Sequence, residues 1–115
     1  MWIFTTSGFV SAVRSQSDRT IIVRSRDRAS LTPISKKYQA EIKQTPVADY
    51  PYRLEISADD FAEWVSDQAK NIYYPNFKSA VAIHRNRLFA KVLGEVWSVM
   101  HGVEDGNARK ATDNH

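Results

Sequence analysis

The sequence predicts an α+β fold, a two-layer sandwich in which an antiparallel sheet of four to five strands carries two to three helices on one face. In the first half of the chain, short β-branched and aromatic runs alternate with polar turns, which is typical of strands. In the second half, apolar residues recur at helical spacing. The early strands are joined by connections too short for parallel crossovers, so we expect them to pair antiparallel.

The first 26 residues are predicted to form three strands. Ser7 and Gly8 make the first tight turn, and the polar residues 16–19 make the second. The three strands are expected at residues 2–6, 9–15 and 20–26.

The middle of the chain is predicted to contain one short helix and two further strands. Leu31, Ile34 and Tyr38 lie at helical spacing in a helix at 28–38, where Pro33 is tolerated only within the first turn. The strands are expected at residues 40–45 and 52–56, with a loop between them.

The chain is predicted to be helical from Ser57, which begins a sequence resembling a capping box, to about residue 70. The Tyr-Tyr-Pro break at 73–75 ends this part, and Asn76 caps a further helix with a possible kink near 84–86. An apolar stripe on this helix is predicted to pack as core, with Met100 and the neighbouring Trp97 allowed to stay partly exposed: Phe77, Val81, Leu88, Val92, Val96 and Met100.

The chain has 115 residues, of which 43% are hydrophobic and 11% aromatic, as expected for a globular protein. We expect a small single domain at residues 1–101 and a disordered tail at 102–115.

Cysteine is absent, which excludes disulfides and thiolate metal sites, and we expect no metal and no cofactor. No apolar run approaches the roughly 20 residues that span a bilayer, and the first residues lack the regions of a secretory signal. The sequence therefore indicates a cytoplasmic protein that does not contact a membrane.

The net charge of +3 is distributed unevenly along the chain. Residues 1–58 carry nine Lys and Arg against five Asp and Glu, whereas residues 59–115 carry seven against eight. A mild basic bias of this kind permits a nucleic-acid or an acidic protein partner but requires neither.

Arginines alternate at the end of the third predicted strand and define a possible nucleic-acid-binding face. Arg24, Arg26 and Arg28 alternate along this strand and are expected to point to the same side, and Arg14 extends the patch from the neighbouring strand. Such a face could follow the phosphates of a nucleic acid. The alternative is an outer sheet face that uses arginine only to stay solvated.

Two blocks of tyrosine and proline, at residues 48–53 and 72–78, are the most distinctive chemistry of the sequence. Tyrosines held by proline in loops present a fixed surface for stacking and hydrogen bonding. The alternative is that these rings are buried at the ends of strands and helices. The candidate partner-binding residues are Tyr50, Tyr52, Arg53, Tyr73, Tyr74 and Lys78.

No catalytic residue and no metal ligand is predicted. His84 and His101 are too far apart in sequence to share a metal on one helix, and no nucleophile elbow or phosphate-binding glycine loop is present. A small enzyme with a pocket lined by tyrosine and arginine is kept as an alternative.

With these residues in view, the sequence resembles a family of short bacterial and phage-encoded proteins with no established activity. The resemblance rests on four segments, residues 1–13, 49–53, 74–79 and 96–100. It implies no cofactor and no catalytic residue, and it supports the two tyrosine-proline blocks as the surface of interest.

We therefore expect a non-enzymatic binding module that engages a macromolecule. A protein partner is slightly favoured over a nucleic acid, because the net charge is modest and few cations lie among the aromatic residues. The sequence does not indicate an oligomeric state.

Overall fold

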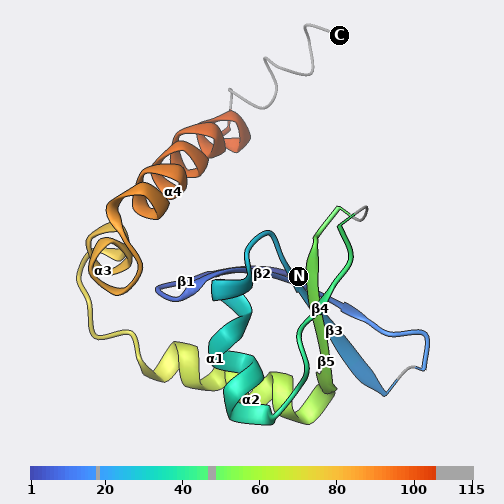
Figure 1. The fold of residues 1–115 in the computed structure, drawn as a ribbon. Helices are drawn as coiled ribbons and strands as arrows, with labels where there is room; N and C mark the ends of the chain where they lie inside the picture. The colour runs from blue at the N-terminus through green and yellow to red at the C-terminus, as the bar shows by residue number, and fades with distance from the viewer. Residues whose placement is uncertain (18, 47–48, 106–115) are drawn as a thin grey trace, which may run out of the picture. The chain divides into compact units, whose positions relative to one another are not determined.

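A computed structural model describes residues 1–17, 19–46 and 49–105 (Figure 1). Its contacts divide the chain into two compact units, Met1–Pro75 and the part that begins at Asn76. The elements of the first unit are β1 (Trp2–Thr5), β2 (Gly8–Arg14), β3 (Thr20–Ser25), α1 (Arg28–Tyr38), β4 (Lys43–Gln44), β5 (Tyr52–Ser57) and α2 (Ala58–Lys70). Those of the second are α3 (Phe77–His84), α4 (Arg87–Val99) and the 3₁₀ turn η1 (Met100–Val103).

The five strands form one antiparallel sheet in the order β1-β2-β3-β5-β4. This confirms the predicted α+β class and the predicted antiparallel pairing. The third strand ends at Ser25, because Asp27 already serves as the N-cap residue of α1. The strand predicted at 40–45 pairs only over Lys43–Gln44, although Ala40 and Ile42 pack against the core.

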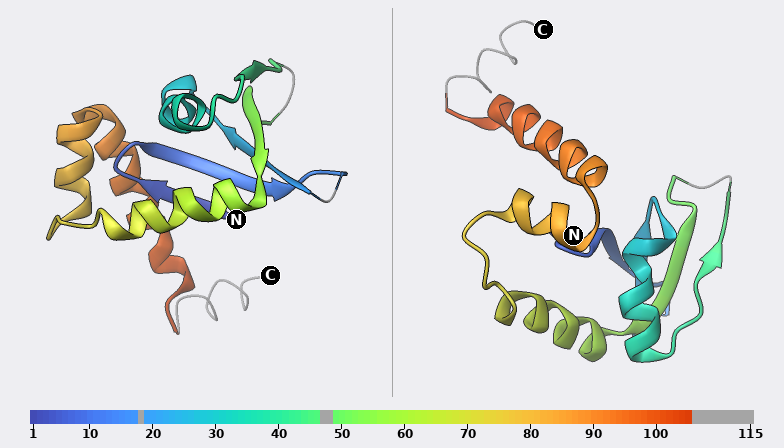
Figure 2. Two further views of the ribbon diagram at one scale, coloured as in Figure 1. Left: turned by 90° about the horizontal axis from the view of Figure 1, so that it is seen from below. Right: turned by 60° about the vertical axis from the view of Figure 1, so that its left-hand side comes forward.

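The core of the first unit lies between one face of the sheet and the two helices α1 and α2 (Figure 2). Alternate residues of β2, β3 and β5 point to this side, as the period of a strand requires. Leu31 and Ile34 of α1 are fully buried there, as predicted from their spacing. The buried residues of this core are Val10, Ala12, Val23, Leu31, Ile34, Leu54, Ile56, Phe61 and Trp64.

The second unit is a pair of helices rather than one long helix. Asn76 and Asn86 each accept a hydrogen bond at the start of a helix, from the backbone N–H of Ser79 (2.9 Å) and of Phe89 (2.7 Å). The predicted cap at Asn76 is confirmed, and the kink expected near 84–86 is a complete break.

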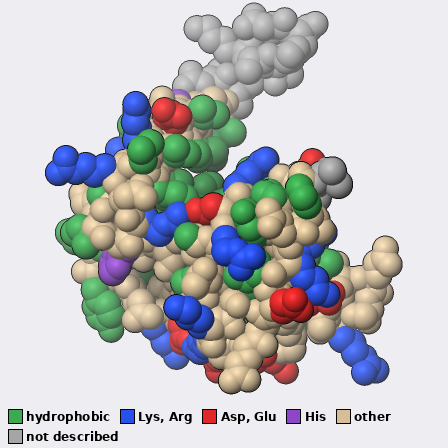
Figure 3. All heavy atoms as spheres, viewed as in Figure 1, with side chains coloured by type: hydrophobic (Ala, Val, Ile, Leu, Met, Phe, Trp, Pro, Cys, Tyr) green, Lys and Arg blue, Asp and Glu red, His purple; other side chains and the backbone are tan. Residues whose placement is uncertain are grey.

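The apolar stripe of the second unit is buried only in part. Val81 is buried, whereas Leu88 and Val92 are exposed, so the prediction that these two residues pack as core is wrong. Figure 3 shows hydrophobic side chains along the visible side of α4. Residues 102 and 103 of the predicted tail belong to the turn η1, and residues 106–115 of that tail lie outside the described residues.

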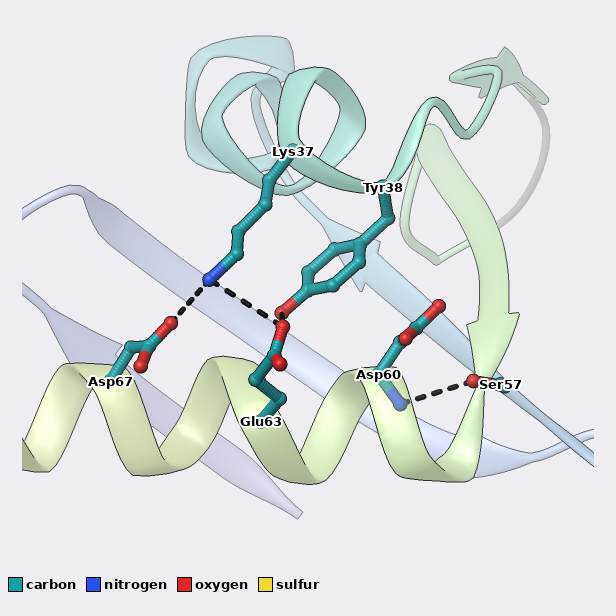
Figure 4. A network of polar contacts seen from close by, with 6 residues as sticks. All are labelled: Lys37, Tyr38, Ser57, Asp60, Glu63 and Asp67. Atoms are coloured by element: carbon teal, nitrogen blue, oxygen red, sulfur yellow. Dashed lines mark hydrogen bonds and ion pairs between the residues drawn. The ribbon is translucent and has the colours of Figure 1, made fainter.

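Helices α1 and α2 contact each other, and the start of α2 agrees with its sequence, but α1 differs from its prediction in one respect. Ser57 accepts a hydrogen bond from the Asp60 backbone N–H at 3.0 Å, which confirms the predicted cap of α2 (Figure 4). Lys37 of α1 pairs with Asp67 of α2. The exception is Pro33, which lies beyond the first turn of α1; its ring is exposed, and the helix continues past it.

Across the described ranges, no helix is long and apolar enough to cross a membrane.

Candidate functional site

The face of the sheet opposite α1 and α2 carries polar, cationic and aromatic side chains, and we call it the open face. Its residues are those that alternate with the core residues along each strand. They are Trp2 and Phe4 of β1, Phe9, Ser11 and Val13 of β2, Ile22 and Arg24 of β3, Arg53 and Glu55 of β5, and Lys43 of β4.

The pairing register places one row of side chains across all five strands of the open face. Trp2 lies opposite Ser11, and Ser11 lies opposite Arg24. Arg24 lies opposite Arg53, which in turn lies opposite Lys43. We call Arg24, Arg53 and Lys43 the cationic row. Like charges directly opposite each other on paired strands destabilise a sheet, so this arrangement calls for a compensating anion.

The two arginines of the cationic row have few partners. Arg24 donates from Nη2 to Ser11 Oγ at 2.8 Å, and Arg53 donates from Nη2 to the Tyr50 carbonyl at 3.5 Å. Both Nε atoms are buried and have no hydrogen-bond partner, counting all the residues that the structure describes. Neither guanidinium forms an ion pair with any described carboxylate.

Tyr50 packs over Arg24 of the open face and over Arg26, which follows the end of β3. Its buried ring centroid lies 4.7 Å from Cζ of Arg24 and 5.0 Å from Cζ of Arg26, within the range of cation–π contacts. Arg26 also donates to the Asp49 carbonyl at 3.0 Å. The Tyr50 ring therefore holds the arginines in place by packing, and it is not itself an exposed binding group.

Three aromatic rings at the β1 edge complete the open face, and we call Trp2, Phe4 and Phe9 the aromatic cluster. The Phe9 centroid lies 5.7 Å from that of Trp2 and 4.6 Å from that of Phe4. Trp2 is 69% exposed and Phe4 is 37% exposed. The sequence reasoning did not single out these residues or Lys43, although the alternation of Trp2 with Phe4 was the available signal.

The predicted arginine patch is brought together only in part. Arg24 and Arg26 share the Tyr50 ring, but Arg28 is the first residue of α1. The Arg28 guanidinium lies 5.6 Å from the Tyr52 ring, which packs against the core. The prediction that Arg24, Arg26 and Arg28 share one strand is therefore wrong, because β3 ends at Ser25.

Arg14 lies on the helix side of the sheet. It follows Ala12 in the strand alternation and lines an apolar cavity of about 480 Å³ together with Phe61 and Val65. It therefore does not extend the arginine pair of the open face.

The tyrosine-proline block at 72–78 is divided between the two units. Tyr73 is 88% exposed, and Tyr74 lines a hollow of about 230 Å³ together with Phe4 and Val65. Lys78 belongs to the second unit, where its Nζ lies 5.3 Å from the Trp97 ring centroid. Of the predicted partner-binding residues, Arg53 lies in the cationic row and Tyr50 packs beside it.

Comparison with known proteins adds no further constraint on the site. No protein-family model, curated protein or solved structure matches the chain. The resemblance to bacterial and phage-encoded proteins therefore stays a prediction from the sequence.

Among the described residues, no group of three or more His, Asp or Glu side chains is placed to hold a metal ion.

Proposed function

We propose that the protein is a non-enzymatic binding module whose open face binds single-stranded nucleic acid. The observation that carries this proposal is the cationic row, which forms no ion pair with a described carboxylate and lies beside exposed aromatic rings on the same face. A cytoplasmic location belongs to this proposal, as expected from the sequence.

The two kinds of side chain on the open face match the two parts of a nucleotide. Guanidinium groups bind phosphate oxygens with paired hydrogen bonds, and exposed aromatic rings stack on bases. From β1 to β4 the row crosses four strand spacings, about 19 Å, which is enough for several nucleotides. A duplex hides its bases, so stacking on Trp2 requires a single strand.

The binding of short labelled oligonucleotides tests this function. We expect a 12-nucleotide single strand to increase in fluorescence anisotropy with the protein at 50 mM NaCl, and its affinity to fall several-fold by roughly 200 mM NaCl. Trp2→Ala should weaken binding roughly 5- to 150-fold, because loss of one stacked base costs about 1–3 kcal/mol.

Arg19→Ala is the matched control for the charged residues. Arg19 is exposed in the turn between β2 and β3 and lies outside the open face. We expect it to change affinity far less than Arg53→Ala. Absence of binding to single-stranded DNA and RNA at 50 mM NaCl, or equal losses in these two variants, contradicts the proposal.

A protein partner is the second candidate function, and the exposed residues of α4 favour it. Leu88, Val92 and Trp97 are large apolar side chains exposed on one short helix. Aromatic and aliphatic side chains of this kind anchor protein interfaces. A partner captured from host lysate by the wild-type protein and lost with Trp97→Ala, but not with Trp2→Ala, would favour this function over the first.

A further inference from the structure

We infer that Arg24 and Arg53 form a discrete site for a phosphate dianion, the group found at the phosphorylated end of a nucleic-acid strand. The inference rests on the proposed function for the strand, while the anion site itself rests on the geometry of the two arginines. It names a specific ligand group, which the general proposal of nucleic-acid binding does not.

The first argument is that the arginine pair is unfavourable for the folded protein by itself. Two cations directly opposite each other on β3 and β5 repel each other. Each also has a buried Nε–H without an acceptor, and such a buried donor costs free energy. Residues that reduce stability in this way are typical of binding sites, where a ligand supplies the missing interactions.

The second argument is that both guanidinium groups can reach one phosphate. Side chains opposite each other on paired strands have Cβ atoms about 5 Å apart. Both guanidinium groups also contact the same residue, since Arg24 stacks on the Tyr50 ring and Arg53 bonds the Tyr50 carbonyl. The two Nε atoms are covered, so an anion reaches them when the guanidinium groups turn outward on their rotatable stems.

A hollow beside Arg53 provides space for the anion, and the Arg24 guanidinium reaches it by turning away from Ser11. It has a volume of about 210 Å³ and is lined by Arg53, Lys43 and Ile22, together with Leu54 and Glu55. Lys43 is exposed and lies opposite Arg53, so its ammonium group can reach the same anion.

The third argument concerns charge and favours a dianion. The cationic row brings three positive charges together, whereas a phosphodiester carries one negative charge and a phosphomonoester about two near neutral pH. The carboxylate on this part of the open face is Glu55, which accepts a hydrogen bond from Thr20 at 3.3 Å. A terminal phosphate therefore matches the row better than an internal one.

The placement of the aromatic cluster is consistent with recognition of a strand end. Trp2 lies two strands from Arg24, about 10 Å away across the sheet. A strand whose terminal phosphate occupies the arginine pair can thus place one of its first bases on the exposed Trp2 ring.

Thermal unfolding in the presence of inorganic phosphate tests the anion site directly. We expect 20 mM phosphate to raise the unfolding midpoint of the wild-type protein at pH 7.5 when NaCl keeps the ionic strength constant. Arg53→Met should raise the midpoint without phosphate and should abolish the phosphate shift. Arg19→Met, which removes the same charge elsewhere, should keep the shift.

Arg53→Lys is the second variant, and it retains the net charge while removing the planar guanidinium. We expect it to lose most of the phosphate shift. A shift of the wild-type size in Arg53→Lys or Arg53→Met overturns the assignment of the site to these side chains.

Oligonucleotides with and without a terminal phosphate separate this inference from the proposed function. We expect an 8-nucleotide strand with a 5′- or 3′-phosphate to bind the wild-type protein at least about fivefold more tightly than the unphosphorylated strand. Arg53→Lys should abolish that preference, so that the two strands bind with about equal affinity.

The possible outcomes distinguish the two claims. Equal binding of all strands overturns the inference and leaves the proposed function standing. A phosphate shift without binding of any strand overturns the nucleic-acid function and identifies free phosphate as the source of the anion. Absence of both the shift and the binding overturns both claims.

Discussion

The Tyr50 ring lies 4.7 Å from the Arg24 guanidinium and 6.4 Å from the Phe9 ring, so one side chain connects the cations and the aromatic rings of the open face. Its hydroxyl makes no hydrogen bond to a described residue, whereas its carbonyl accepts from Arg53. The side chain therefore contributes through its aromatic ring. The backbone contact does not depend on the residue type.

Two substitutions of Tyr50 separate these contributions. Tyr50→Phe keeps the ring and should change the free energy of unfolding by less than about 0.5 kcal/mol. Tyr50→Leu keeps an apolar side chain but removes the cation–π contacts with Arg24 and Arg26, and it should cost about 1–2 kcal/mol. Urea denaturation monitored by Trp fluorescence measures both. If Tyr50→Phe lowers the free energy of unfolding as much as the loss of about 1–2 kcal/mol expected for Tyr50→Leu, the hydroxyl matters, contrary to this account.

Neighbouring tyrosines illustrate what the sequence predicts at the level of single residues. Tyr52 is in phase with Leu54 and Ile56, so strand alternation alone assigns it to the core side. The opposition of Arg24 and Arg53 is different, because they lie 29 positions apart in the sequence. Their register depends on the packing of α1 and on the path of the chain through β4, which no local pattern specifies.

The contact between α1 and α2 is polar at its exposed edge. Lys37 pairs with Asp67 and lies 3.6 Å from a Glu63 carboxylate oxygen, and the Tyr38 hydroxyl donates to Glu63 at 2.9 Å (Figure 4). The hydrogen bond to Asp67 raises the pKa of Lys37 above its ordinary value. Burial and, next, the hydrogen bond to Glu63 raise the pKa of Tyr38.

These shifts predict a loss of stability at alkaline pH. Both groups have a higher pKa in the folded protein, so their contribution is fully present below about pH 10 and disappears as the pH rises through the raised pKa values. At pH 8, Tyr38→Phe should cost about 1 kcal/mol or less, the net contribution of one hydrogen bond. That difference from the wild type should shrink or reverse by pH 11.5 in urea denaturation. A difference that stays constant with pH would contradict the assignment.

Local sequence signals predict where helix α1 begins and ends, but they do not predict how far strand β4 pairs. Helix α1 spans Arg28–Tyr38 as predicted, because its buried residues recur at helical spacing. Strand β4 is much shorter than predicted: Ala40 and Ile42 pack against the core, but only Lys43 and Gln44 pair with β5. The length over which this segment pairs depends on its contacts with the rest of the molecule, which a β-rich run of residues does not reveal.

The break at Asn76 has a consequence for the whole molecule. Every residue of the main core cluster precedes residue 66, and all five strands, α1 and α2 lie in Met1–Pro75. The expectation of one domain over 1–101 treated the last helices as a necessary cover for the sheet. The core face of the sheet is covered by α1 and α2.

Residues 1–75 are therefore expected to fold without the rest of the chain. The fragment should unfold cooperatively in urea, because it retains the complete core and the α1–α2 contact. Its amide resonances for β2, β3 and β5 should match those of the full chain within small shifts. A fragment of residues 1–60 is the control: it lacks Phe61 and Trp64 and should remain unfolded, since the sheet then loses the aromatic side chains of α2 from its core. A disordered spectrum for residues 1–75 would show that the helices after Asn76 are required for the fold, and would support the single domain that the sequence predicts.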